Sequence, residues 1–177
     1  MDIWNTILTA LLVATTLIST IFAIYYKRKE YKVITNRTIR ISSLITIYET
    51  REAMLKGLHQ MYDIAQPNDI IWGQSVSGRN YGSVVDKISL AASRNVRFKF
   101  LFNKNASVIN QIKDVFCTIS TAQIKESEGN IVRIQGLSEK QVIIAISDYS
   151  SYIGLQISDP TIVCIFKEWF DKRFLEV

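Results

Sequence analysis

The first 26 residues limit what this chain can be more than any other feature. From Ile3 to Tyr26 the sequence contains no charged residue. An α-helix rises about 1.5 Å per residue, so a helix over this run would span roughly 36 Å. That length exceeds the hydrocarbon core of a bilayer, which is about 30 Å thick. We therefore expect residues 1–26 to form a transmembrane anchor that crosses the membrane once.

The residues that flank the uncharged run predict its orientation. Trp4 lies at one end and Tyr25 and Tyr26 lie at the other, as is typical of the two headgroup zones. A basic cluster follows, made of Lys27, Arg28, Lys29 and Lys32. The positive-inside rule then places the C-terminal part in the cytoplasm, at the cell membrane. A cleaved signal peptide is the alternative, but it requires a basic start and a shorter apolar run.

The rest of the chain has the size of one domain. We divide it into a basic juxtamembrane stalk at 27–40 and a domain at 41–177. After residue 32 the sequence contains 17 basic and 14 acidic residues, a net charge of +3. This weak excess is compatible with anionic lipid or nucleic acid as a partner but requires neither.

Apolar residues recur with helical spacing in some segments and alternate in others. The helical spacing predicts helices at 50–65, 83–93, 106–116 and 161–174. The alternating or short apolar runs predict strands at 39–48, 69–72, 96–102, 123–125, 131–135, 141–146 and 151–156. Strands that alternate with helices favour an α/β sandwich with a mostly parallel sheet and a terminal hairpin.

Three segments carry a resemblance to a known family. Residues 91–101 read AASRNVRFKFL, residues 138–145 read SEKQVIIA before Asp148, and residues 152–157 read YIGLQI before an aromatic-rich helix. This order resembles the phospholipase D-like family over about 50–174, and within it the short nuclease type with one motif per chain. The resemblance implies an α/β fold with a mixed β-sheet flanked by helices, here after one transmembrane helix. It also implies a homodimer.

The family's catalytic motif is degenerate in this sequence. The resemblance puts Ser138 at the position of the catalytic histidine and Lys140 at that of the motif lysine. The motif aspartate is either replaced by Ala145 or displaced to Asp148, and the Gly-Ser-x-Asn stretch keeps only its glycine, Gly154. A serine hydroxyl without a neighbouring base is a poor nucleophile. The resemblance therefore implies a pseudoenzyme with no catalytic residue.

A ligand site is predicted from the motif and from the loop at 73–82. From the motif come Ser138, Lys140 and Asp148. From the loop come Arg79, which can grip an anion with two donors, and Tyr81, which can stack on a ligand. The alternatives are an ordinary surface lysine and a plain connecting loop.

The remaining reactive side chains suggest structural roles. Cys117 and Cys164 lack CxxC spacing and are predicted to be buried, reduced thiols. His59 is the only histidine and is interpreted as a structural residue of the first helix after the anchor. No metal or cofactor is expected. The aromatic residues of the last helix are predicted to lie in the core, namely Phe166, Trp169, Phe170 and Phe174.

Together these patterns predict a membrane-tethered, catalytically inactive phospholipase D-like module. It would bind an anionic ligand or a protein partner, for sensing or scaffolding, and nucleic acid stays open as a partner. The alternative is an active membrane-bound phosphodiesterase or nuclease with a non-standard active site. Such an enzyme would use Lys140, Asp148 and His59 from a second copy of the chain.

The orientation of the anchor can be tested directly. Because the basic cluster follows the apolar run, protease added outside intact cells or spheroplasts should leave the domain uncut. The same protease should digest the domain after the cells are lysed. Digestion in intact cells would show that the predicted orientation is wrong.

Overall fold

The computed structural model describes residues 18–19, 21, 38–40, 43–75, 84–104, 109–128, 132–147 and 152–177. The chain divides into two units, Met1–Arg37 and Thr38–Val177. Among the described residues, no helix has both the length and the apolar character to span a membrane. Nearly all of the predicted anchor at 1–26, and the stalk up to residue 37, lie outside the described residues.

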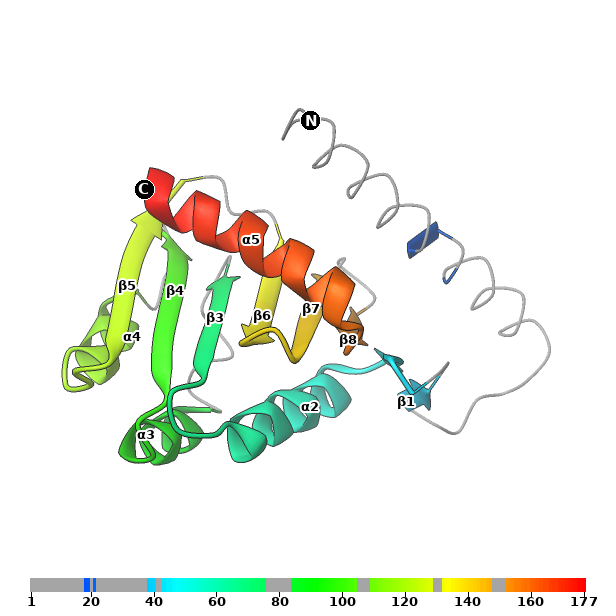
Figure 1. Cartoon of the computed structure of the whole chain (residues 1–177), viewed down its shortest axis with the longest axis horizontal. Coiled ribbons are helices and arrows are strands. Elements are labelled where there is room, and N and C mark those ends of the chain that lie inside the picture. The colour runs from blue at the N-terminus through cyan, green and yellow to red at the C-terminus, as the bar shows by residue number, and fades with distance from the viewer. Residues whose placement is uncertain are drawn as a thin grey trace. The chain divides into compact units, whose positions relative to one another are not determined.

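The second unit contains strands and helices in mixed order (Figure 1). The helices are α2 (Arg51–Ile64), α3 (Val85–Ser93), α4 (Ile109–Phe116) and α5 (Pro160–Glu176). The strands are β1 (Thr38–Arg40), β2 (Ile45–Tyr48), β3 (Ile70–Ser75), β4 (Arg97–Asn103), β5 (Ala122–Ser127), β6 (Arg133–Leu137), β7 (Gln141–Ser147) and β8 (Tyr152–Ile157). β1 pairs with β2, so the sheet begins inside the segment predicted as stalk.

In the described part of the chain, eight strands form one mixed sheet in the order β1-β2-β8-β7-β6-β3-β4-β5. Only the pairs β3–β4 and β4–β5 are parallel. The expected mostly parallel sheet is therefore wrong, whereas the mixed sheet implied by the family resemblance is confirmed. The reason is topological: after β5 the chain returns to the other side of β3 and continues through antiparallel neighbours, β6, β7 and β8.

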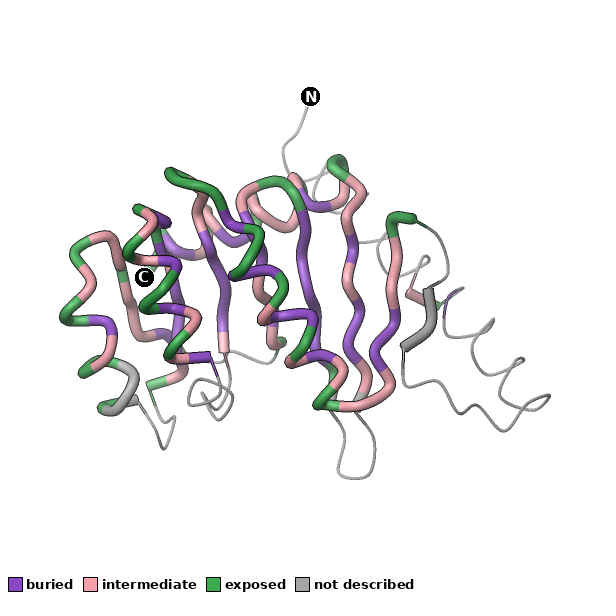
Figure 2. Tube along the Cα trace, turned by 90° about the horizontal axis from the view of Figure 1, so that it is seen from below, coloured by how far each residue is buried: buried purple, intermediate pink, exposed green. Residues whose placement is uncertain are grey.

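Helices cover both faces of this sheet. α2, α3 and α4 pack on one face, where their buried side chains meet Phe98, Phe100 and Phe102 of β4. The alternation of β4 sends Lys99 to the other face, where its ammonium lies 5.6 Å from the centre of the Phe174 ring of α5. Figure 2 shows buried residues along the strands and exposed residues on the outer sides of the helices.

Local signals set the ends of the helices. The Thr50 side chain accepts a hydrogen bond from the Ala53 N–H at 3.2 Å and caps α2, which ends before Pro67. The Asp159 carboxylate accepts from the Ile162 N–H at 3.0 Å and caps α5, with Pro160 in the first turn. The sequence prediction for both helices is confirmed to within about two residues.

β3 extends beyond its predicted end at residue 72 because its glycine allows it to lie close to β6. The sequence placed Gly73 in a loop, but it lies within β3, opposite Gln135 of β6. A Cβ atom at Gly73 would collide with the Ile134 carbonyl oxygen. This glycine therefore permits a close strand pair instead of a turn. The rest of the predicted loop, 76–82, lies outside the described residues.

Two predictions about individual side chains need correction. Phe170 and Phe174 are buried, as predicted, but Phe166 is half-buried and Trp169 is 37% exposed, because α5 turns it away from the sheet. Cys117 is exposed and Cys164 half-buried, so the two thiols are free but not buried. His59 lies on α2 and is half-buried.

A glycine of β6 makes room for the largest buried side chain. The Trp72 indole is fully buried and lies 5.2 Å from the Phe170 ring, between ring centres. A Cβ atom at Gly136 would overlap that indole. We expect Gly136→Ala to lower the free energy of unfolding by about 2 kcal/mol, because the tryptophan would have to move within a packed core.

Urea denaturation of the full chain in detergent, followed by tryptophan fluorescence, measures this change. Gly154→Ala is the matched control. Its nearest new neighbour, at 3.0 Å, is the flexible side chain of Met54, so its effect should be smaller. Equal effects of the two substitutions would contradict the role of Trp72.

Candidate functional site

Ser138 and Lys140, two of the predicted site residues, lie in the turn between β6 and β7. Ser138 has a φ of 45°, a left-handed conformation that is uncommon for residues other than glycine. Its N–H donates to the Ile70 carbonyl at 2.7 Å, and its own carbonyl accepts from the Trp72 indole at 2.9 Å. β7 begins only at Gln141. Ser138 and Lys140 therefore lie before the strand, in agreement with the strand predicted at 141–146.

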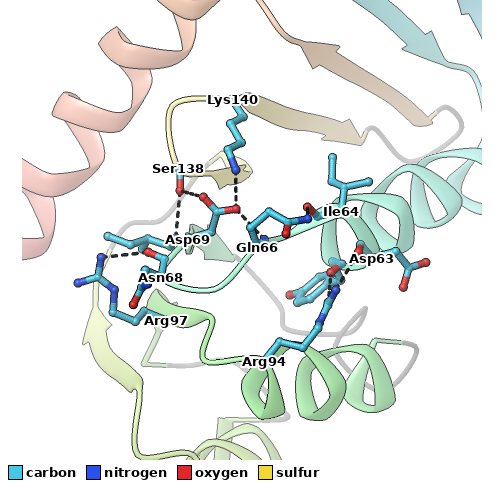
Figure 3. A network of polar contacts seen from close by, with 11 residues as sticks. Asp63, Ile64, Gln66, Asn68, Asp69, Arg94, Arg97, Ser138 and Lys140 are labelled. Atoms are coloured by element: carbon cyan, nitrogen blue, oxygen red, sulfur yellow. Dashed lines mark hydrogen bonds and ion pairs between the residues drawn. The ribbon is translucent and has the colours of Figure 1, made fainter.

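The carboxylate of Asp69 holds this turn (Figure 3). It accepts from the Ser138 hydroxyl at 2.8 Å and from the Lys140 ammonium at 2.6 Å. It also accepts from the Gln66 N–H at 2.8 Å. The Asp69 side chain is 11% exposed and that of Lys140 is 50% exposed. The lysine thus has a mostly buried carboxylate as its fixed partner.

These contacts favour the charged form of Asp69. Burial by itself would raise the pKa of this carboxyl group. Hydrogen bonds from Lys140, Gln66 and Ser138 lower it, and the charge of Lys140 lowers it further, so the pKa lies below the ordinary aspartate value. A carboxylate with a lowered pKa is a weak base. It therefore does little to activate the Ser138 hydroxyl as a nucleophile.

Further polar contacts extend this network to the neighbouring helices. The Arg94 guanidinium, after α3, donates to the carbonyls of Tyr62 at 2.5 Å and Asp63 at 2.9 Å, in the last turn of α2. The Arg97 guanidinium donates to the Asn68 carbonyl at 3.1 Å. These bonds join α2, α3, β3, β4 and the β6–β7 turn where β3 and β4 begin (Figure 3). The arrangement is that of a structural clamp.

The other three predicted site residues, Arg79, Tyr81 and Asp148, lie outside the described residues. The described residues that precede them, Ser75 and Ser147, end β3 and β7. Both strands run antiparallel to β6, so they end at the sheet edge opposite the β6–β7 turn. The structure thus brings Ser138 and Lys140 together on Asp69, away from the edge where β3 and β7 end. Ligand binding by the five residues stays a prediction.

That opposite edge has the topology of a ligand site. The chain leaves β3 towards β4 on one side and returns as β6 on the other. In α/β sheets, ligands bind outside the carboxyl ends of the parallel strands where the strand order reverses in this way. A cavity of about 50 Å³ lies there, with room for a group of a few non-hydrogen atoms. Its lining consists of Met54, Leu58, Gln74, Ser75, Arg133, Ile134, Gln135, Ile143 and Ala145.

Arg133 supplies the positive charge of this cavity. The side chain is half-buried, and its guanidinium has no hydrogen bond or ion pair within the described part of the chain. Beside it on β6, the Gln135 amide donates to the Tyr62 hydroxyl at 2.6 Å. Burial raises the pKa of the Tyr62 phenol, although the bond from Gln135 opposes the shift. Tyr62 is therefore neutral, and Arg133 has no negative neighbour from this side.

Gln74 also lines the cavity, but its side chain lies on the α5 face of the sheet. It pairs with Ile134, whereas Arg133 and Gln135 lie on the α2 face. Its side chain is 5% exposed, and its amide nitrogen donates to the Val132 carbonyl at 2.9 Å. Its amide oxygen is buried and has no hydrogen-bond partner among the described residues. A buried acceptor without a partner is costly. This one lies across the sheet from Arg133 and does not add to the polar groups of its site.

Sequence reasoning missed the central residues of both regions. It treated Asp69 as the start of a strand and the segment containing Arg133 and Gln135 only as a short strand candidate. The spacing of those two residues was a usable signal, because positions i and i+2 of a strand share one face. Among the described residues, no cluster of histidine, cysteine or acidic side chains could hold a metal ion.

Three solved structures are similar to this chain. TrmBL2, an archaeal chromatin protein whose structure shows a mode of DNA binding, matches with a TM-score of 0.62 and 16% identity over 98% of this chain. NucT from Helicobacter pylori matches with a TM-score of 0.55 and 13% identity, over 75% of this chain and 95% of its own. Phosphatidylserine synthase from Haemophilus influenzae Rd KW20 matches with a TM-score of 0.54 and 7% identity, over 77% of this chain and 40% of its own.

These likenesses show a phospholipase D-like fold, to which the nuclease and the synthase belong. At identities this low they show the fold alone. The chain spans 65% of the length of the chromatin protein. No protein-family model matches the sequence, and no curated protein matches it.

The clamp around Asp69 predicts a dependence of stability on pH. The folded-state pKa of Asp69 is lowered, so its contribution is complete above the unfolded pKa of about 3.9 and disappears as the pH falls through the folded value. We expect Asp69→Asn to lower the free energy of unfolding at pH 7 by about 2 kcal/mol, since hydrogen bonds to a charged acceptor are lost. The difference from the wild type should shrink towards pH 3.

Urea denaturation of the full chain in detergent at several pH values measures both effects. Asp63→Asn is the matched control, because Asp63 forms an exposed ion pair with Lys87, with side chains 46% and 33% exposed. That pair should contribute little. If both variants unfold alike at all pH values, Asp69 is not the residue that holds the turn.

Proposed function

We propose that this chain is a membrane-tethered phospholipase D-like module that has no catalytic activity and binds an anionic ligand. In this proposal it has one membrane span, a cytoplasmic domain and a role in sensing or scaffolding. The observation that carries the ligand proposal is Arg133, a half-buried guanidinium without a protein partner in the described residues. It lines a cavity at the edge of the sheet where ligands of α/β proteins bind.

The chemistry of the described side chains supports a lack of catalysis. Phosphoryl transfer through a covalent intermediate requires an activated nucleophile and a group that returns the proton. The single histidine of the sequence, His59, lies on α2 and not on β6 or β7. The Ser138 hydroxyl donates a hydrogen bond to the Asp69 carboxylate, and Lys140 forms an ion pair with the same carboxylate. These residues serve the clamp instead of a reaction.

The anion is best described as a phosphate group. A guanidinium binds phosphate through two parallel hydrogen bonds, and the cavity has room for a group of that size. The phosphate could belong to nucleic acid or to a lipid headgroup. Nucleic acid is favoured by the likeness to a DNA-binding chromatin protein and to NucT. A homodimer, as the family resemblance implies, would place two such sites in one assembly, and a protein partner is a further proposal.

Binding without turnover is the expected result for the purified chain. In detergent, the full chain should bind a fluorescently labelled single-stranded oligonucleotide weakly, with an affinity that falls as salt rises. Arg133→Gln should weaken this binding about 10-fold, because a hydrogen bond to a charged group contributes about 1.5 kcal/mol or more. Fluorescence anisotropy measures the binding, and release of nitrophenol from a chromogenic phosphodiester measures turnover.

Two control variants locate the site. Arg97→Gln removes the same charge from the opposite edge of the sheet, where the Arg97 side chain is exposed and donates to Asn68. Lys140→Gln tests the position that the family resemblance singled out. Both should bind nearly as well as the wild type. Equal losses in all three variants would contradict a site at Arg133, and turnover that Lys140→Ala abolishes would establish the enzyme alternative.

A further inference from the structure

The outer face of α5 carries large apolar side chains that are partly exposed in the described part of the chain. Most exposed positions of this helix recur every three or four residues, and the exposed positions are 160, 161, 165, 168, 169, 172, 175 and 176. They include Ile165 and Trp169, each 37% exposed, and Leu175, which is 80% exposed. The outer side of a helix on a soluble domain is normally polar. Here the inner side of α5 is already apolar, since Phe170 and Phe174 are buried.

Scattered exposed hydrophobic residues are common and need no partner. The case of α5 differs because Ile165 and Trp169 are neighbours at i and i+4 on one face of the helix, so their exposed parts lie side by side. A tryptophan in such a position has a large apolar ring with one polar N–H. This combination suits the boundary between water and the lipid headgroups.

The start of α5 lies beside the turn between β1 and β2. β1 is the first strand of the domain and pairs with β2. Between these strands, the Leu44 carbonyl accepts from the Ser158 N–H at 2.8 Å, directly before α5, and the Leu44 side chain is 41% exposed. The first turn of α5 is therefore a neighbour of the β1–β2 turn, while Thr38, where the chain enters the domain, lies at the other end of β1 opposite Tyr48.

The length of chain before β1 limits how far this face can move from a membrane. Eleven residues, 27–37, separate the predicted anchor from Thr38. Fully extended, they reach at most about 40 Å. Thr38 of a domain held by the anchor therefore stays within this distance of the bilayer, whatever the conformation of the connecting residues. The lipid surface is the partner that is always present.

The charges on the outer face indicate which lipids it suits. Its charged residues are Glu168, Lys172 and Glu176, with a net charge of −1. This face has no electrostatic preference for anionic lipid. A contact with the bilayer would depend on Ile165 and Trp169, and it should form on uncharged phosphatidylcholine and persist at high salt.

We propose that the outer face of α5, centred on Ile165 and Trp169, docks on the lipid surface of the membrane that anchors the chain. This inference rests on the membrane tether of the proposed function. Docking fixes the orientation of the domain, because α5 covers one face of the sheet and turns the opposite face, with α2 and α3, towards the cytosol (Figure 1).

Tryptophan fluorescence of the full chain in vesicles tests the docking. The chain has three tryptophans, Trp4, Trp72 and Trp169. In the variant Trp4→Phe, only the fully buried Trp72 and the exposed Trp169 remain. This variant is reconstituted into phosphatidylcholine vesicles with brominated acyl chains, and the vesicles are isolated by flotation. The lipid should quench most of the emission that Trp169 contributes, and acrylamide in the water should quench it little.

Two further variants provide the background and the control. Trp4→Phe with Trp169→Phe gives the emission of Trp72 alone. Adding Leu90→Trp to that background places a tryptophan on α3, at a position where the native leucine is 53% exposed. Because α3 packs on the other face of the sheet, acrylamide should quench this tryptophan and the brominated lipid should not.

The possible outcomes distinguish a failure of the docking proposal from a failure of the membrane-anchor proposal. A chain that does not float with the vesicles overturns the anchor and the docking together. A chain that floats, with Trp169 open to acrylamide and unquenched by lipid, overturns the docking alone. Protection of Trp169 from both quenchers means that a second copy covers the face, which also overturns the docking. Equal lipid quenching at Trp169 and at Leu90→Trp overturns it as well, because the domain would have no preferred side.

Discussion

A single carboxylate determines how the polar residues of this domain are used. Asp69 is almost buried at the start of β3, and a buried charge must be paired and hydrogen-bonded. The chain meets this requirement with the hydroxyl of Ser138, the ammonium of Lys140 and a backbone N–H from Gln66. These bonds fix the β6–β7 turn, including the left-handed conformation of Ser138. They also remove the motif-like serine and lysine from the groups that are free to bind a ligand.

The polar groups at the two edges of the sheet therefore differ in whether they have protein partners. At the edge where β3 begins, every charged group described above has a protein partner, and the bonds hold helices and strands together. At the edge where β3 ends, Arg133 and the amide oxygen of Gln74 have none among the described residues. Stabilising polar contacts and polar groups without a partner are thus located at opposite ends of the same strands among the described residues. A substitution at either edge is expected to affect mainly stability or mainly the proposed ligand binding.

Local patterns were enough to predict the helices and most strands, because capping residues, proline and apolar spacing act within a few positions. The Asp69–Ser138 hydrogen bond joins residues 69 positions apart, so no local sequence pattern predicts it. The same holds for the antiparallel return of β6 beside β3, which brings Ser138 next to Asp69. Trp169 was placed in the core because helical spacing alone does not tell the inner side of an apolar helix from its outer side.

The proposed membrane tether and the proposed site at Arg133 would form a consistent combination. One guanidinium in a small cavity gives modest affinity, since a single charge-assisted contact contributes only about 1.5–3 kcal/mol. An anchored domain meets its ligand in a thin layer beside the membrane, where the effective concentration of another membrane-bound molecule is high. Docking through α5 would strengthen this effect by restricting the directions in which the cavity can point. Weak binding at Arg133 is then adequate for a partner or phosphate group that is held at the same surface.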